Sequence, residues 1–497
     1  MHSLDKDLMS MQEVRDLIAR SKKAQLAFAD RDHAYVDRII KSIADAGVRN
    51  AERLGKMANE ETGFGIPADK TIKNIFGSRV TYEYVKDMKT TGVIEEDEAA
   101  GVTTMAIPMG VIAGIIPSTN PTSTVLNNVI ISLKGRNSIV LSPHPSALNC
   151  ILETVKVIRQ AISEAGGDPD LVGVITIPTR QATEILMSHH DTAMVIATGG
   201  SAMVRAAYSS GTPAIGVGPG NGPAFIDKSA DLPLAVKRIM DSKTFDNGTI
   251  CASEQSVVCV YEIAAAVEAE LTRQGAYFLS DAEKDQLGKF ILRANGTMNP
   301  EIVGKSAQTV AQLAKLTNVP ATARVLVARE DGIGFGHPYS NEKLSPILAF
   351  YTAETYEEAC GICRDILTYE GAGHTMSMHT KDLDKVNYFA KHVPVARLVV
   401  NTPATLGGIG ASTGLVPAMT LGCGAIGGSA TSDNVGPMNL INLCRIAVGK
   451  KEIEEVRASA PVCRDGICET STAASCSTAS VDVDAIVQAI LDKLNRS

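Results

Sequence analysis

Cys251 is the residue whose type and surroundings best suit a nucleophile. It lies in the run KTFDNGTICASEQ, Lys243–Gln255, where a small polar loop leads into the cysteine and small polar residues follow it. A nucleophilic cysteine needs access, a lowered pKa and nearby backbone donors. A cysteine in such a run can equally be a buried structural thiol, so local sequence leaves both roles open.

Histidine supplies a candidate acid–base group. His374 lies in the run GAGHT, in which Gly371 and Gly373 keep the backbone open. A histidine that titrates near neutral pH can take up the proton of an attacking thiol. The alternative is a loop histidine that is hydrogen-bonded to the backbone. His379, five residues further on, is the less favoured candidate.

The other cysteines indicate structure rather than chemistry. The chain has 10 Cys without the regular spacing of a disulfide framework, and we expect reduced thiols. Cys360 and Cys363 resemble half of a zinc site, but the sequence has no second pair at zinc spacing. Helical periodicity predicts that both are core residues, and no metal is expected.

The elements that must position these residues alternate between strand and helix. Residues 12–64 have helical periodicity, and residues 97–116 alternate toward strand. Strand-like and helix-like segments then alternate to about residue 230, and a second α/β stretch runs from there to about 435. This order predicts the α/β class, with a parallel, doubly wound sheet that binds ligands at its carboxyl edge.

Composition narrows the classes of function. The chain has 497 residues, which suggests about three domains. A formal net charge of −8, 4% aromatic residues and the absence of Trp argue against a nucleic-acid binder. The sequence predicts no membrane span and no secretory leader, so we expect a cytoplasmic protein without a membrane partner.

The composition changes toward the C-terminus. Residues 461–480 are small and polar, which is typical of a flexible linker. Residues 481–497 carry an apolar stripe at helical spacing. A helix of this length is marginal alone in water, so we expect it to fold on another surface.

Seven motifs stand in a fixed order along the chain. They are GIIPSTNPTS (114–123), NSIVLSPHPSA (137–147), ATGGSAMVRAAYSSGTPAIGVGPGNGP (197–223), KTFDNGTICASEQS (243–256), EKLSPILAFY (342–351), GAGHT (371–375) and MTLGCG with DNVGP (419–424 and 433–437). Together they resemble the CoA-acylating branch of the aldehyde dehydrogenase superfamily, over roughly residues 10–455. The chain looks closest to the N-terminal half of bifunctional aldehyde–alcohol dehydrogenases and to stand-alone acetaldehyde or propionaldehyde dehydrogenases.

The resemblance implies that Cys251 attacks the aldehyde carbon, that hydride leaves for a nicotinamide, and that a second nucleophile releases the acyl group. It also implies an oxyanion site formed by the backbone N–H of Cys251 and the side chain of Asn120. Hydrolytic relatives place this Asn one position earlier, where Thr119 stands. The alternative is that Asn120 is a turn residue before Pro121. His374 would take the proton of the CoA thiol.

The residue at position 217 favours CoA over water as the acyl acceptor. Hydrolytic relatives carry there a Glu that activates water, whereas this chain has Val217. An apolar side chain cannot accept a proton, while a thiol with a pKa of about 8.5 is already partly ionised at neutral pH. We therefore expect acyl-CoA as the product, in a reversible reaction.

The resemblance implies a nicotinamide cofactor bound by residues of several separate runs. These residues are Ile116, Pro117, Ser118, Thr119, Ser142, His144, Gly199, Gly200, Ser201, Gly216 and Glu342. Gly199–Ser201 would open a helix whose N-terminus suits a pyrophosphate, although this is also an ordinary helix start. Glu342 would hold ribose hydroxyls or be merely exposed, and His144 would contact the cofactor or shape its turn. NAD is expected, with NADP tolerated because no carboxylate is visible to repel a 2′-phosphate.

The implied architecture has three parts. A Rossmann-like NAD-binding domain spans 1–95 and 110–228, and an α/β catalytic domain spans 229–432. A bridging β-hairpin arm, 96–109, pairs with a strand from 433–460. Such an arm has edge strands that need a partner, so a homodimer or homotetramer is expected.

The expected reaction oxidises a short-chain aldehyde, acetaldehyde first, with NAD and coenzyme A to acyl-CoA and NADH. Propionaldehyde or sulfoacetaldehyde is the alternative substrate. A scaffold or cargo protein without catalysis is the non-enzymatic alternative, and the presence of Cys251 and Glu342 argues against it. The helix 481–497 resembles peptides that target enzymes to the shell of a bacterial microcompartment; packing on its own subunit is the alternative.

Overall fold

The computed structural model describes residues 5–293, 296–459, 462–464 and 467–469 of the chain. The chain divides into two compact units. The larger unit comprises Met1–Ile94 and Thr104–Cys444, and the smaller one comprises Glu95–Thr103 and Arg445–Ser497. Both large sheets, and every candidate site residue, belong to the larger unit. The α/β class predicted from the sequence is confirmed.

A five-stranded parallel sheet has the strand order β5-β4-β3-β6-β7. Its strands are β3 (Val111–Ile116), β4 (Ser138–Pro143), β5 (Val172–Val174), β6 (Thr192–Thr198) and β7 (Ala214–Val217). Every residue of β3 and β4 is buried, as expected for central strands that helices cover on both faces. The continuous apolar runs that predicted these strands have this origin.

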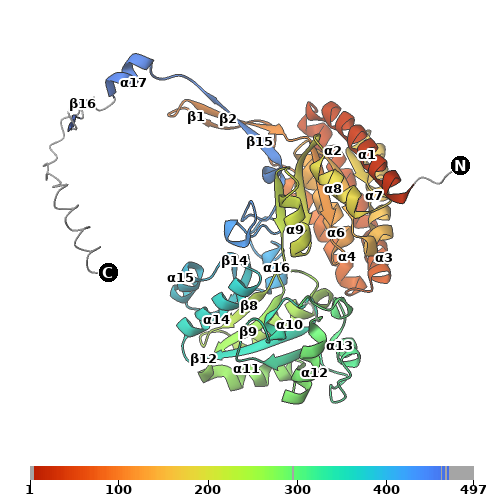
Figure 1. The fold of residues 1–497 in the computed structure, drawn as a ribbon, viewed down its shortest axis with the longest axis vertical. Helices are drawn as coiled ribbons and strands as arrows, with labels where there is room; N and C mark the ends of the chain where they lie inside the picture. Colours follow the sequence, from red (N-terminus) through yellow and green to blue (C-terminus); the bar gives the residue numbers. More distant parts are fainter. Residues whose placement is uncertain (1–4, 294–295, 460–461, 465–466, 470–497) are drawn as a thin grey trace. The chain divides into compact units, whose positions relative to one another are not determined.

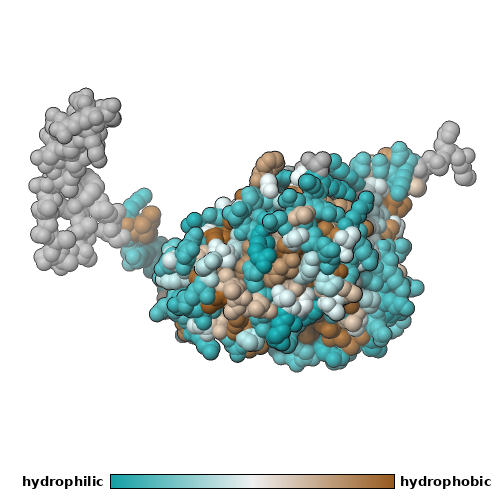
Figure 2. Space-filling model, turned by 90° about the horizontal axis from the view of Figure 1, so that it is seen from below, coloured by the Kyte–Doolittle hydropathy of each residue, from teal (hydrophilic) through white to brown (hydrophobic). Residues whose placement is uncertain are grey.

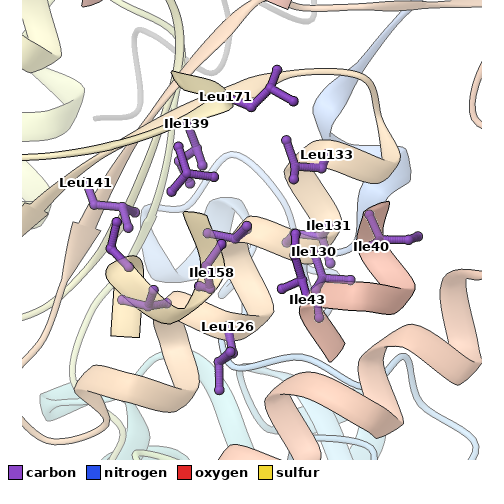
Figure 3. Close-up of a cluster of buried hydrophobic side chains, with 14 of the residues drawn as sticks. Ile40, Ile43, Leu126, Ile130, Ile131, Leu133, Ile139, Leu141, Ile158 and Leu171 are labelled. Atoms are coloured by element: carbon purple, nitrogen blue, oxygen red, sulfur yellow. The ribbon is translucent and has the colours of Figure 1, made fainter. Parts of the chain in front are cut away.

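Helices cover both faces of the five-stranded sheet. One face packs against α2 (His33–Arg49), α6 (Pro121–Lys134) and α7 (Leu148–Glu164), and the other against α1 (Lys6–Ala29), α8 (Arg180–Ser188) and α9 (Ser201–Tyr208). Figure 3 shows the first of these interfaces, where side chains of the helices meet those of β4. The labelled side chains, all at most 1% exposed, are Ile40, Ile43, Leu126, Ile130, Ile131, Leu133, Ile139, Leu141, Ile158 and Leu171.

The helical run expected over residues 12–64 is in fact three helices, α1, α2 and α3 (Ala51–Thr62). The side chain of Asp32 accepts a hydrogen bond from the N–H of Tyr35 and thereby caps α2. Caps of this kind start a new helix, because they satisfy N–H groups that have no partner within it. After α3 come α4 (Pro67–Ile75), the π-helix η1 (Phe76–Val80) and α5 (Thr81–Val85).

A second, seven-stranded parallel sheet has the order β10-β11-β12-β9-β8-β13-β14. Its strands are β8 (Gly222–Ile226), β9 (Glu254–Val260), β10 (Ala276–Phe278), β11 (Val325–Arg329), β12 (Ile347–Ala353), β13 (Gly373–His379) and β14 (Val395–Val400). One face packs on α10 (Leu232–Thr244) and α11 (Tyr261–Arg273), and the other on α12 (Asp281–Ile291), α13 (Ala307–Leu313), α14 (Tyr356–Tyr369) and α15 (Leu383–His392). Figure 1 shows these elements in green and teal.

Cys360 and Cys363 lie on α14 and belong to the core beneath this sheet, with 2% and 0% exposure. The helical interpretation of this pair is therefore confirmed. Each neighbours other apolar side chains of the same cluster, so packing accounts for both residues.

Three further strands, β1 (Gly92–Asp97), β2 (Val102–Pro108) and β15 (Ile441–Ala447), form a small sheet in the order β1-β2-β15. The short helix α17 (Ile453–Ser459) follows. Within the segment expected to be a linker, β16 (Val462–Arg464) pairs antiparallel with β17 (Ile467–Glu469). Residues 470–480 of that segment and the helix expected over 481–497 lie outside the described residues.

In the part of the chain that the structure describes, no helix is both long enough and apolar enough to cross a bilayer. On the face that Figure 2 shows, hydrophilic and hydrophobic residues are interspersed.

Candidate active site

The candidate site residues come from opposite edges of the two large sheets. The runs after β3, β4, β6 and β7 follow the carboxyl ends of strands in the five-stranded sheet. Cys251 and His374 instead stand at the amino ends of β9 and β13 in the seven-stranded sheet, and Glu342 precedes β12. The candidate cofactor loops therefore come from one sheet, and the candidate reactive side chains come from the other.

A strained loop presents Cys251. It follows the 3-10 turn η4 (Phe245–Gly248), in which Asp246 and Asn247 have φ of 47° and 53° and Gly248 has φ of 73°. A left-handed conformation is costly for residues other than glycine, and such strain clusters at functional sites. Cys251 is partly exposed and packs against the small apolar cluster that contains Ile250 and Ala252.

Three of the predicted residues lie around Gly220. A Cβ on Gly220 would overlap the carbonyl oxygen of Cys251 and lie 3.2 Å from Cε1 of His374. The backbone N–H of Gly220 donates to Oε1 of Glu342 at 2.8 Å. Only glycine fits this position, and Cys251, His374 and Glu342 therefore surround one point.

The thiol of Cys251 is neutral in this arrangement. Burial, and then the nearby Glu342 carboxylate, raise the pKa of Cys251 to about 12, and the Arg397 guanidinium opposes them. Burial and the charge of Glu370 also raise the pKa of Glu342, to about 8. Activation of the thiol therefore requires that the effect of burial be offset, and above pH 8 that of the Glu342 charge as well.

His374 is fully buried, and its two ring nitrogens differ. Nδ1 lies 3.1 Å from the Thr375 hydroxyl, whereas Nε2 has no hydrogen-bond partner among the described residues. Burial, together with the positive charge of Arg397, lowers the pKa of His374 to about 3, so the ring is neutral at neutral pH. A neutral ring with a free Nε2 can accept or donate one hydrogen bond in the site.

His379 is not part of this site. It is the last residue of β13, and His374 is the second, so five residues of strand, roughly 16 Å, separate them.

Arg397 is a buried residue that sequence reasoning missed. It lies on β14, is 4% exposed, and donates to Oγ1 of Thr375 at 3.1 Å, to the carbonyl of His374 at 3.1 Å and to that of Gly422 at 2.7 Å. Its remaining N–H groups face the carbonyl of Ser432 and Oδ1 of Asn434. A lone Arg in a strand gives no sequence signal for a role that depends on loops more than 20 residues away.

The side chain of Asn120 faces the nucleophile loop. Its Nδ2 lies 3.4 Å from the carbonyl oxygen of Thr249, two residues before Cys251, and its Oδ1 accepts from Nζ of Lys73 at 2.6 Å. Asn120 precedes α6 as its N-cap residue but makes no side-chain cap bond, so a turn role does not use the amide. The hydroxyl of Thr119 instead lies 3.2 Å from Nδ2 of Asn120.

The cofactor residues expected from the sequence fall into two groups. Several side chains have other structural partners. Ser142 is 3% exposed and bonds to the hydroxyl of Thr183 at 2.8 Å. Nδ1 of His144 accepts from the N–H of Ser146 and so contributes to the turn after β4. A Cβ on Gly216 would strike Val204, so this glycine lets α9 approach β7.

The other group is open to a ligand. Ile116 ends β3, and Pro117, Ser118 and Thr119 are partly exposed beyond it. Helix α9 begins at Ser201 as expected, and Gly200 caps it without a side-chain hydrogen bond. Apart from its neighbours in the chain, no described residue has an atom within 4 Å of where a Cβ of Gly200 would be. Free N–H groups at a helix start with open space in front suit a phosphate group.

Val217 ends β7 and is 2% exposed. Position 217, which by resemblance matches the water-activating Glu of hydrolytic relatives, is therefore buried and apolar. Of the carboxylates, Glu342 is the one whose charge acts on the Cys251 thiol, and its Oε1 is engaged by the N–H of Gly220.

Comparison with known proteins identifies the class. Residues 6–314 match the aldehyde dehydrogenase family model, and the chain belongs to this family. Individual relatives confirm that the motifs resemble those of the CoA-acylating branch. A probable aldehyde dehydrogenase from Listeria monocytogenes EGD-e is 61% identical, with a TM-score of 0.90 over 91% of this chain and 100% of that chain. An acetylating aldehyde dehydrogenase from Geobacillus thermoglucosidasius is 46% identical, with a TM-score of 0.88 over 91% and 99%.

The chain is also 44% identical over 441 residues to the bifunctional aldehyde-alcohol dehydrogenase AdhE of Escherichia coli (strain K12). The match covers 88% of this chain and 49% of that protein, so the chain spans about half the length of this relative.

Proposed function

We propose that this chain is a CoA-acylating aldehyde dehydrogenase that oxidises a short-chain aldehyde with NAD and coenzyme A to acyl-CoA and NADH. The observation that carries the proposal is the convergence of Cys251, His374 and Glu342 around Gly220. The second support is the buried, apolar Val217 at the position where hydrolytic relatives carry their base.

Cys251 is the nucleophile. The thiol loses its proton to solvent, the sulfur bonds to the aldehyde carbon, and the oxygen that becomes negative is stabilised by the backbone N–H of Cys251 and by Nδ2 of Asn120. The amide nitrogen of Asn120 has two long contacts, 3.2 Å to the hydroxyl of Thr119 and 3.4 Å to the carbonyl of Thr249, and an oxyanion is a stronger acceptor than either.

His374 handles the proton of the acyl-transfer step. The CoA thiol donates to Nε2 of His374, its sulfur bonds to the acyl carbon, and the bond from that carbon to Cys251 breaks. The proton passes by way of His374 to the departing Cys251 sulfur, so charge and atoms balance. The unpartnered Nε2 supports this role. Because burial lowers the pKa of His374 to about 3, the ring cannot keep the proton and must pass it on to the departing sulfur.

The open edge of the five-stranded sheet fits a dinucleotide. The N-terminus of α9 would hold the pyrophosphate, the segment after β3 would line the nicotinamide, and Glu342 would hold ribose hydroxyls. When bound, the nicotinamide supplies the hydride acceptor. NAD is proposed, with NADP tolerated, since an engineered glycolyl-CoA reductase that is 28% identical has bound NADP+.

Relatives support the acyl acceptor. A propionaldehyde dehydrogenase from Rhodopseudomonas palustris, 28% identical with a TM-score of 0.79, has been solved with bound CoA and an acylated cysteine. Another structure of that enzyme holds propionyl-CoA. By similarity we assign the acylated position to Cys251 of this chain.

An uncharged aldehyde, acetaldehyde first, suits the site better than an anionic one. Curated relatives include acylating dehydrogenases of succinate semialdehyde, 37% identical, and of sulfoacetaldehyde, 38% identical. An anionic substrate needs a free cation. Among the described residues, the guanidinium that acts on Cys251 is Arg397, whose N–H groups already face acceptors of the protein.

The proposal includes a homodimer or homotetramer that forms through β15. This strand ends the small sheet, and Leu443 and Ile446 on it are 45% and 49% exposed.

The proposal also includes targeting by residues 481–497 to a microcompartment shell, which would place the enzyme in the lumen of that compartment rather than free in the cytoplasm. A propionaldehyde dehydrogenase of a Clostridium phytofermentans microcompartment, 28% identical, is the supporting relative.

Acyl transfer tests the proposal in the reverse direction. The full chain is incubated with acetyl-CoA without NADH, and peptides are analysed by mass spectrometry. One acetyl group on Cys251, which free CoA removes, is the expected result. Wild-type protein that carries no acetyl group on Cys251 would overturn the proposal, and a Cys251→Ser variant that retains the biological role would favour a scaffold.

A further inference from the structure

We propose that Lys73 positions the amide of Asn120, so that its NH2 group is aimed at the oxygen that becomes negative when Cys251 attacks. Lys73 is then a positioning residue for the oxyanion site, supplied by α4 of the N-terminal region. This inference rests on the proposed function, because it takes Asn120 as an oxyanion donor.

All three donors of the Lys73 ammonium group have acceptors in the site. Nζ donates to Oδ1 of Asn120 at 2.6 Å, to Oγ1 of Thr249 at 2.9 Å and to Oδ2 of Asp246. The side chain is 2% exposed, so these contacts are shielded from water. Lys73 therefore ties the Asn120 segment to the loop that carries Cys251.

An ammonium group fixes which way an amide points. The group has donors only, so it can contact the oxygen of the Asn120 amide and not the nitrogen. The nitrogen must then lie on the opposite side, where it approaches the carbonyl of Thr249 at 3.4 Å. Without Lys73, the amide of Asn120 could turn over and present its oxygen, which would repel an oxyanion.

Asp246 holds the ammonium group in place. Its Oδ1 accepts from the N–H of Ile66 at 2.6 Å, and its Oδ2 accepts from Oγ1 of Thr249 at 2.7 Å and from Nζ of Lys70 at 3.1 Å. Although burial raises the pKa of Asp246, the charges of Lys73 and Lys70 lower it below its ordinary value. The left-handed backbone of Asp246 is thus stabilised by the same ion cluster that orients Asn120.

Lys70 offers a matched control. It is buried to the same degree, with a side chain 3% exposed, it lies on the same helix, and it binds the same oxygen of Asp246. Its other acceptor is the carbonyl of Thr119 rather than the amide of Asn120. Loss of either lysine weakens the ion cluster, but only loss of Lys73 frees the Asn120 amide.

Two reactions of Cys251 separate positioning from general disruption. Rapid mixing of the enzyme with NAD and acetaldehyde, without CoA, measures the NADH burst, which requires oxyanion stabilisation. Alkylation by iodoacetamide uses the same thiol but displaces iodide and forms no oxyanion. Lys73→Met should slow the burst by about 100-fold, comparable to Asn120→Ala, and leave the alkylation rate within about threefold.

The remaining variants complete the test. Lys70→Met should slow the burst far less than Lys73→Met does, and Lys73→Met combined with Asn120→Ala should be no slower than Asn120→Ala alone. Lys73→Gln, which keeps a donor of nearly the same reach, should restore part of the burst and replaces Lys73→Met if that variant does not fold.

The inference is overturned by equal loss with Lys70→Met, by equal loss of burst and alkylation, or by additive effects with Asn120→Ala. A wild-type enzyme that gives a burst while neither Lys73 variant slows it also overturns the inference and leaves the proposed function standing. A wild-type enzyme without any burst would instead count against the proposed function.

Discussion

Replacement of Glu342 by glutamine should make the Cys251 thiol more acidic, and the effect should appear only at alkaline pH. After burial, the charge of Glu342 is the largest contribution that raises the pKa of Cys251. A like charge at short range shifts a pKa by about one to three units. We expect a fall of about one unit, because burial, which the substitution leaves in place, dominates. One unit corresponds to about tenfold more thiolate.

The pH dependence follows from the pKa of Glu342 itself. Burial and Glu370 raise it to about 8, so Glu342 is mostly neutral at pH 7 and becomes charged as the pH rises past 8. In the wild-type protein the thiolate fraction therefore rises less steeply above pH 8. In Glu342→Gln it continues to rise about tenfold for each pH unit, because no charge develops beside the thiol.

The assay is the rate of alkylation of Cys251 by iodoacetamide from about pH 6.5 to about pH 10, without cofactor. A Cys251→Ala protein corrects for the other thiols. The two profiles should coincide near pH 7 and differ by about tenfold near pH 10. Glu370→Gln is the matched control, since it should lower the pKa of Glu342 and move the change of slope to lower pH. Superimposable profiles of the wild type and Glu342→Gln would refute the reasoning.

Three further substitutions test the geometry. Gly220→Ala should lower kcat by about 100-fold or more, because a Cβ would displace the carbonyl of Cys251. The control is Gly449→Ala, whose Cβ would contact no described residue beyond its neighbours in the chain; its kcat should stay within about twofold of the wild type. His374→Ala should retain the CoA-independent NADH burst but slow CoA-dependent turnover by about 100-fold or more; loss of both would contradict the proton role. Arg397→Met should lower the free energy of unfolding, measured in urea, by about 3 kcal/mol or more, because it leaves several buried carbonyls without a donor. A change below about 1 kcal/mol would show that those contacts are weak.

Much of the fold was predictable because its signals are local. β3 and β4 are continuous apolar runs, since helices bury both of their faces. The periodic stripe of α7 likewise follows from one buried face. The breaks inside the run 12–64 were missed, because apolar periodicity continues across them while the Asp32 side chain starts a new helix.

Only those site residues that stand in recognisable motifs could be predicted from the sequence. Cys251, His374 and Glu342 stand in runs that resemble a known family, and the structure brings them together around Gly220. The contacts of Lys73 and Arg397 could not be predicted, because they join residues far apart in the chain. Lys73 lies 47 positions before Asn120, and 173 before Asp246. No pattern within one element indicates such pairs.

The most direct test of the central claim is NADH formation from acetaldehyde, measured with and without CoA at equal concentrations of Cys251 thiol. Val217 is apolar, and Glu342 is engaged by the N–H of Gly220, so water should not be activated efficiently. The account predicts sustained turnover only with CoA, and at most one equivalent of NADH per Cys251 without it. Sustained turnover without CoA would contradict the account, because it would mean that a base of this site delivers water to the acylated cysteine.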